Sequence, residues 1–114
     1  MRPGQLKPNE FEVAILERLA LDLPRLAPLI SQLHVQSREY TGVGSYTNFL
    51  CAESTPEFGE QPVHLNSLIS MPGVPNGMGA VLFFENGKPK FLEIFTYGDP
   101  WDGAYDGFSI DKVA

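Results

Sequence analysis

The stretch MGAVLFFENGKPKFLEIFTY, residues 78–97, decides the expected fold. It holds two apolar runs around the dipeptide Asn86-Gly87, which strongly favours a two-residue hairpin turn because both residues tolerate positive φ. Both runs carry apolar side chains at odd and even positions, a pattern typical of strands with two covered faces. The segment therefore predicts an antiparallel hairpin at the centre of a sheet.

The same turn predicts the register of the two strands. With the dipeptide at its centre, Glu85 faces Lys88 as a cross-strand charge pair. The same alignment places Glu93 near Ala80, in the middle of the hairpin. The carboxylate of Glu93 is therefore expected within the sheet rather than at one of its ends.

Two charged side chains, Arg38 and Glu93, lie within predicted strands. A buried charge is costly unless it is paired. We expect a structural contact, either between Arg38 and Glu93 or between Lys90 and Glu93. The alternatives are a catalytic or ligand-binding carboxylate at Glu93, and a sheet edge that is open to water.

The rest of the second half of the chain predicts short strands separated by turns. Aromatic and β-branched residues mark the strands, while glycine and proline mark the turns. The predicted strands are 35–40, 46–51, 63–71 and 108–110, and the predicted turns and loops are 41–45, 53–62, 72–79 and 98–107.

Residues 9–33 carry the periodicity of helices. Asn9 and Glu12 have the spacing of a capping box, which satisfies two backbone donors at a helix start. Apolar residues at three- and four-residue intervals then predict a helix over about 10–21. Because the two prolines that follow fit the first turn of a helix better than its interior, we expect two short helices, or one bent helix, ending near Leu33.

Helices followed by antiparallel strands predict an α+β fold. One or two N-terminal helices are expected to pack on a mostly antiparallel sheet of about five strands. The expected organisation is a single domain over residues 1–114, with a flexible lead (1–8), a helical part (9–33) and a β-rich part (34–114).

The charge balance argues against two classes of partner. The chain has 114 residues and a formal net charge of −6, and its eight basic residues are scattered. Nucleic acids and anionic membranes both require clustered Lys and Arg, so neither is expected as a partner. An acidic surface instead favours a basic protein partner. The single cysteine and the short apolar runs predict a cytoplasmic protein.

No group of residues predicts catalysis, a metal or a cofactor. Cys51 with His34 or His64 could supply a nucleophile–base pair, but a cysteine in an apolar strand is usually a small buried hydrophobe. The glycine-rich residues 73–79 lack the ending of a phosphate loop and lead into a strand. Three aspartates near glycines lack the alternate spacing of a calcium loop: Asp99, Asp102 and Asp106.

Residues 97–105 form the segment best suited to bind a partner. Trp101 and Tyr105 are the predicted anchors, because Trp and Tyr are frequent at the centres of interfaces. Asp99 and Asp102 are acidic neighbours that would meet a basic partner. The alternative interpretation is that Trp101 folds back and closes the core beneath a long loop.

A pocket between helices and sheet is the second predicted site. Tyr40, Tyr46, Glu93 and Tyr97 would line it, and Arg38 belongs either to the pocket or to a structural ion pair. An apolar cleft with a few convergent polar groups is typical of small-molecule sites. A third hypothesis is a homodimer that pairs through an exposed strand edge.

Three segments stand out after residue 37: REYTGVGSYTNF (38–49), GAVLFFENG (79–87) and LEIFTY (92–97). In these segments the chain resembles a group of small bacterial domains of unknown function. Such proteins have an N-terminal helical segment, a Thr-Gly-Val-Gly strand pair and a hairpin that contains Leu-Glu. Ser45 stands where members usually carry an aromatic residue, and Tyr46 follows it. The resemblance implies no known activity.

In size and charge the chain is also similar to the immunity proteins that neutralise bacterial toxins. This is an analogy of general character, because fold and size do not determine function. The leading hypothesis from the sequence is a non-enzymatic protein-interaction module, with a small-molecule-binding domain or weak enzyme and a homodimeric structural domain as the alternatives.

Overall fold

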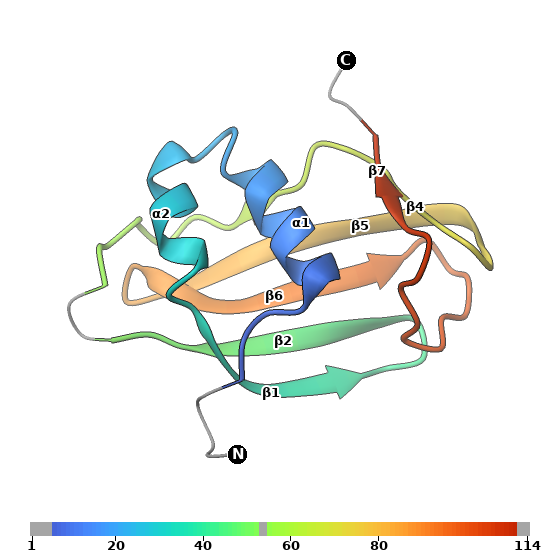
Figure 1. Ribbon diagram of the computed structural model, residues 1–114, viewed down its shortest axis with the longest axis horizontal. Coiled ribbons are helices and arrows are strands. Elements are labelled where there is room, and N and C mark those ends of the chain that lie inside the picture. The colour runs from blue at the N-terminus through green and yellow to red at the C-terminus, as the bar shows by residue number, and fades with distance from the viewer. Residues whose placement is uncertain (1–5, 53–54, 112–114) are drawn as a thin grey trace.

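The computed structural model describes residues 6–52 and 55–111, in which short helices precede a β-sheet (Figure 1). No helix within these residues is long and apolar enough to cross a membrane. The helical elements are α1 (Glu10–Leu19), the 3-10 turn η1 (Pro24–Leu26) and α2 (Ala27–Ile30). The strands are β1 (His34–Tyr40), β2 (Gly44–Leu50), β3 (Val63–His64), β4 (Ile69–Met71), β5 (Val74–Glu85), β6 (Lys88–Thr96) and β7 (Ser109–Ile110).

The strands form one antiparallel sheet in the order β1-β2-β6-β5-β4-β7, and β3 also pairs with β5. The hairpin of β5 and β6 lies in the middle of this sheet, as its apolar sequence predicts. The α+β class is confirmed. The sheet has seven strands rather than about five, so the predicted strand count is wrong.

Two predicted segments differ in the structure, and the first of them supplies an additional strand. Residues 63–71 form β3 and β4 with an irregular segment between them, instead of one strand. The predicted loop at 72–79 is a tight turn at Pro72-Gly73, after which β5 begins at Val74. Pro75 is tolerated in this strand because the pairing of β5 with β6 starts only at Met78, so the proline lies where β5 has no partner on that side.

The helices begin where the sequence predicts and end slightly earlier. The capping box is confirmed: the side chain of Asn9 accepts from the backbone N–H of Glu12, and the side chain of Glu12 accepts from that of Asn9. α1 ends at Leu19 rather than near residue 21. The second helical segment is two short pieces, η1 and α2, and Pro28 lies in the first turn of α2.

The hydrophobic core lies between the helices and one face of the sheet. Figure 1 shows α1 and α2 on the same side of the strands. The shortest dimension of the molecule is 20 Å, which corresponds to one layer of helix on one layer of sheet. The opposite face of the sheet has no described element over it. The largest fully buried side chains of the core are Phe11, Ile15, Leu16, Leu19, Leu26, Leu33, Val35, Ile69, Met78, Leu82, Leu92 and Ile94.

The predicted flexible lead is partly described. Residues 1–5 lie outside the described residues. Leu6 forms an isolated antiparallel bridge with Val35 on the outer edge of β1, and the backbone N–H of Val35 donates to the carbonyl oxygen of Leu6 at 2.7 Å. The outer edge of β1 is thus partly occupied by the chain itself.

Candidate functional site: an uncovered aromatic sheet face

A β-bulge in the central hairpin decides which face carries Glu93. Glu85 is the backbone partner of Lys88 as predicted, although its ion pair is with Lys90, and the register shifts by one residue shortly after the turn. Glu93 therefore pairs with Val81 rather than with Ala80, and the predicted register is wrong beyond the bulge. Because side chains alternate between the two faces of a strand, this shift places Glu93 on the uncovered face instead of the helix side.

Apolar side chains, most of them aromatic, occupy this uncovered side, which we call the aromatic face. They come from β2, β5, β6 and the residue that follows β6, and none packs in the core cluster beneath the helices, although Val81 is itself buried. The ring centroids of Phe83 and Phe91 are 4.6 Å apart, and those of Tyr46 and Phe91 are 5.8 Å apart. The aromatic face consists of Tyr46, Val81, Phe83, Phe91, Phe95 and Tyr97.

Gly79 allows two of these rings to lie close to the strand. A Cβ atom at Gly79 would come within 2.7 Å of the Phe95 ring and 2.8 Å of the Tyr97 hydroxyl. The two rings also contact each other, with centroids 5.5 Å apart in an edge-to-face arrangement. The aromatic face is therefore built of rings that support one another, although Tyr97 remains 57% exposed.

Glu93 lies at the centre of the aromatic face beside the ring of Tyr46. The two residues are direct partners between β6 and β2, and the Tyr46 hydroxyl donates to the carboxylate of Glu93 at 3.3 Å. Glu39 is the partner of Tyr46 on the other side, in β1. The negative charge of Glu93 is the main cause that raises the pKa of Tyr46 above its usual value, and Glu39 acts in the same direction.

Replacing Glu93 with glutamine is expected to lower the pKa of Tyr46 toward that of free tyrosine, about 10. The reason is that the neutral amide no longer opposes the negative charge of the tyrosinate. The measurement is a pH titration of ring-labelled tyrosines by NMR. Glu17→Gln, on the exposed side of α1, removes the same charge and should leave Tyr46 unchanged. Equal Tyr46 pKa values in the two variants would contradict the contact.

Arg38 lies on the opposite side of the sheet and pairs with Glu12 of α1. Its Nη2 and Nε donate to the two carboxylate oxygens, each at 2.8 Å, and this hydrogen bonding raises the pKa of Arg38. The predicted pairing of Arg38 with Glu93 is wrong, because the bulge separates them onto different faces. Lys90 lies near Glu85, with 4.0 Å between Nζ and Oε1, and not beside Glu93.

Trp101 folds back onto the core, which was the alternative interpretation of its loop. The side chain is 8% exposed, and its ring packs against Phe11 and Tyr40 at centroid distances of 6.2 and 5.9 Å. The indole N–H donates to the carbonyl oxygen of Ala104 at 2.8 Å. Trp101 is therefore not available on the surface as an interface anchor.

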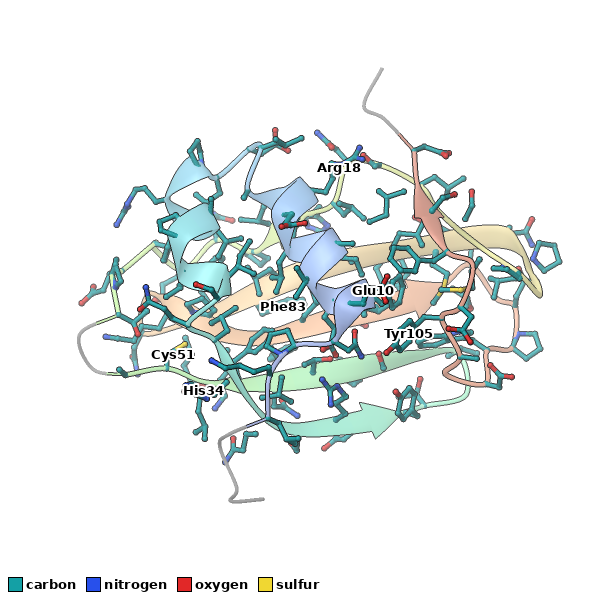
Figure 2. The ribbon with its side chains drawn as sticks, in the orientation of Figure 1. Glu10, Arg18, His34, Cys51, Phe83 and Tyr105 are labelled. Carbon is teal, nitrogen blue, oxygen red and sulfur yellow. The ribbon has the colours of Figure 1, made fainter. Side chains whose placement is uncertain are left out.

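The other residues of the predicted partner-binding loop also make internal contacts. Tyr105 stacks on Phe11 with ring centroids 5.7 Å apart, near the start of α1 (Figure 2). The carboxylate of Asp99 accepts from the backbone N–H of Asn76 at 2.9 Å. Asp102 accepts from the next-but-one backbone N–H within its own turn. A partner-binding role of this loop stays a prediction. Of its four predicted binding residues, three contact distant parts of the fold: Trp101, Tyr105 and Asp99.

The predicted pocket between helices and sheet does not form from the expected residues. Tyr46, Glu93 and Tyr97 lie on the aromatic face, and Tyr40 packs against Trp101. A groove of about 700 Å³ lies elsewhere, along the helical elements. It is lined mainly by apolar residues, with Lys7 and Glu17 among the polar ones, and includes Val13, Ala20, Leu21, Pro24, Ala27 and Ile30.

The residues considered for nucleophilic catalysis are only partly brought together. Cys51 and His34 line one pocket of about 430 Å³ at the end of the sheet (Figure 2), whereas His64 is on β3. Burial raises the pKa of the Cys51 thiol, which donates to the carbonyl oxygen of Pro89 at 3.3 Å. Both effects favour the neutral thiol over the nucleophilic thiolate. Within residues 6–52 and 55–111, no group of three or more His, Cys, Asp or Glu could hold a metal ion.

Comparison of the chain with protein-family models, with curated proteins and with solved structures finds no match. The resemblance to small bacterial domains of unknown function therefore stays a prediction.

Most of the aromatic face was missed by sequence reasoning, although a signal for it was present. The two-sided apolar pattern of the hairpin was interpreted as two covered faces. The helical residues, which end by residue 30, suffice to cover only one side of a seven-stranded sheet. Apolar residues on the second side therefore had to remain uncovered or meet another molecule. The missed residues are Val81, Phe83, Phe91 and Phe95.

Proposed function

We propose that this protein is a non-enzymatic protein-interaction module and that the aromatic face is its contact surface. The observation that carries the proposal is a set of packed aromatic rings in the centre of a sheet face that no described element covers. Contiguous apolar patches are uncommon on monomeric proteins and mark interaction sites when they occur. Tyr and Phe are also enriched at the cores of protein interfaces.

The rigidity of the aromatic face supports this assignment. The rings stand on β2, β5 and β6, which are central strands with hydrogen-bonded neighbours on both sides. Because the rings already pack against one another, little side-chain freedom remains to be lost when a partner binds. On the loop at 97–105, by contrast, the predicted anchor Trp101 is not accessible to a partner, since its side chain is already buried.

The groove along the helices supports a second candidate function, the binding of a small apolar molecule. Its volume of about 700 Å³ lies in the range of drug-sized ligand sites, and its lining is mainly apolar. The aromatic face is the stronger candidate, because it combines large rings with a central carboxylate that fixes orientation.

The proposal is tested by changing the face without disturbing the core. Phe91→Ala combined with Tyr97→Ala removes two rings that do not belong to the core. Leu21→Ala, at a side chain that is 70% exposed on the helical side, is the matched control. Each immobilised protein is used for affinity capture from host lysate, and the captured proteins are quantified by mass spectrometry.

Wild type and Leu21→Ala are expected to retain the same stoichiometric partner. The double variant should retain at least about tenfold less of it, because central aromatic residues dominate interface energies. Unchanged urea unfolding of the double variant would show that the loss is local. Equal capture by all three proteins would refute the aromatic face as the contact surface.

A further inference from the structure

The carboxylate of Glu93 has no cationic partner within the described part of the chain. The ion pairs there join Arg38 to Glu12 and Lys90 to Glu85. Glu93 is partly buried, and the one hydrogen bond that its carboxylate accepts from a described side chain is the long one from the Tyr46 hydroxyl at 3.3 Å. A carboxylate that is partly removed from water, and weakly compensated, gains from a cation that arrives with a partner.

The charges around Glu93 also favour a cation. Glu39 lies across β2 from Glu93, so two carboxylates flank the ring of Tyr46. The two lysines of the hairpin are at its turn end, where Lys90 is already close to Glu85. The side of the aromatic face toward β1 is therefore acidic, from Glu93 at its centre to Glu39, and this side includes the ring of Tyr46.

The rings beside Glu93 distinguish one kind of cation from another. A planar guanidinium can stack on the face of Tyr46 or Phe91 while its N–H groups reach the carboxylate in a bidentate arrangement. A lysine ammonium is more strongly hydrated and provides a point charge without a flat surface. Aromatic rings next to a free carboxylate thus fit arginine better than lysine.

We propose that the protein partner inserts an arginine side chain over Tyr46, with its guanidinium paired to Glu93. This inference rests on the proposed function, because it names the chemistry of the partner at the aromatic face. The arginine lies on the β2 side of the face, and apolar side chains of the partner cover Phe83, Phe91 and Phe95.

A second copy of the chain fits this face less well. Two-fold association through the sheet would bring two chains of net charge −6 together and would bury two unpaired Glu93 carboxylates. Like charges at the centre of an interface oppose association. The charge of the molecule therefore favours a basic partner over self-association.

The test uses capped peptides in which arginine alternates with threonine, with lysine and citrulline peptides of the same length as comparisons. Citrulline keeps the shape of arginine and removes its charge. Binding to the full-length protein is followed by NMR of the backbone amides. The protein variants are Glu93→Gln and, as the matched control, Glu17→Gln.

The arginine peptide is expected to shift the amides of residues 44–48 and 91–95. Its affinity should exceed those of the lysine and citrulline peptides, and Glu93→Gln should weaken it at least about tenfold while Glu17→Gln leaves it unchanged. No shift in these residues, equal binding of the citrulline peptide, or equal affinity for both variants overturns the inference. A dimer formed through this face at working concentration overturns it as well.

The two proposals fail in distinguishable ways. Suppose that Phe91→Ala with Tyr97→Ala abolishes capture of the natural partner and Glu93→Gln does not. The aromatic face is then supported as the contact surface, and the inferred arginine at Glu93 is refuted. If neither variant affects capture, both proposals are wrong.

Discussion

Replacing Glu12 with alanine is expected to lower the free energy of unfolding by about 3–5 kcal/mol, as in other proteins that lose one member of a buried ion pair. Glu12 is 2% exposed and joins three elements of the fold. It caps α1 at Asn9, pairs with Arg38 of β1 and accepts from the Thr47 hydroxyl of β2. Without the carboxylate, these donors lose their shared acceptor, and Arg38 keeps only its bond to the carbonyl oxygen of Lys7 among the described residues.

The measurement is urea unfolding followed by circular dichroism. Glu10→Ala is the matched control, because Glu10 is an exposed acid in the same first turn of α1 (Figure 2). It should cost less than about 1 kcal/mol, which is the usual contribution of an exposed acid to the helix dipole. Similar losses for the two variants would show that Glu12 acts only through the helix terminus.

Replacing Trp101 with alanine is expected to lower the free energy of unfolding by about 3–5 kcal/mol, the range for large aromatic side chains in a core. The indole closes one end of the core against Phe11 and Tyr40. The backbone N–H of Trp101 also donates to the carbonyl oxygen of Gly42 at 2.9 Å, so its loop is attached to the β1–β2 turn. Removing the ring leaves a cavity where these segments meet.

Thermal and urea unfolding of Trp101→Ala provide the measurement, with Tyr97→Ala as an exposed aromatic for comparison. Tyr97→Ala should change stability by less than about 1 kcal/mol, since the side chain is 57% exposed. A Trp101→Ala protein with wild-type stability but without partner binding would show that Trp101 contacts the partner directly. If the stability falls as expected, a loss of binding in this variant is explained by the loss of folded protein.

Local chemistry made several parts of the fold predictable. The capping box needs only the side chains of Asn9 and Glu12, three residues apart, and the structure contains it. The Asn86-Gly87 turn likewise needs only two residues, and Asn86 adopts the positive φ that the turn requires. The central position of the hairpin followed from its apolar composition.

The face of Glu93 could not be predicted in the same way. It depends on whether one extra residue is accommodated in β6 after the turn. Pro89 is a signal for such a bulge, but proline is also tolerated at the start of a strand, so it does not determine the register by itself. A single residue of register reverses the sides of a strand. The error therefore extended to the expected ionic partners and to the predicted pocket.

The position of Trp101 depends on contacts that are distant in sequence. Its ring meets Phe11, which lies on a helix at the other end of the chain. The same loop composition is compatible with an exposed anchor and with a buried one. Burial is decided by the complete tertiary structure, so the sequence left both interpretations open.

The alternation of side chains along β5 and β6 lets one pair of strands serve two separate tasks. Leu82, Leu92 and Ile94 point into the core, while Phe83, Phe91 and Glu93 point away from it. Substitutions at the outward positions leave the inward packing in place. The outward surface of the sheet can therefore diverge during evolution while the scaffold and its folding remain the same.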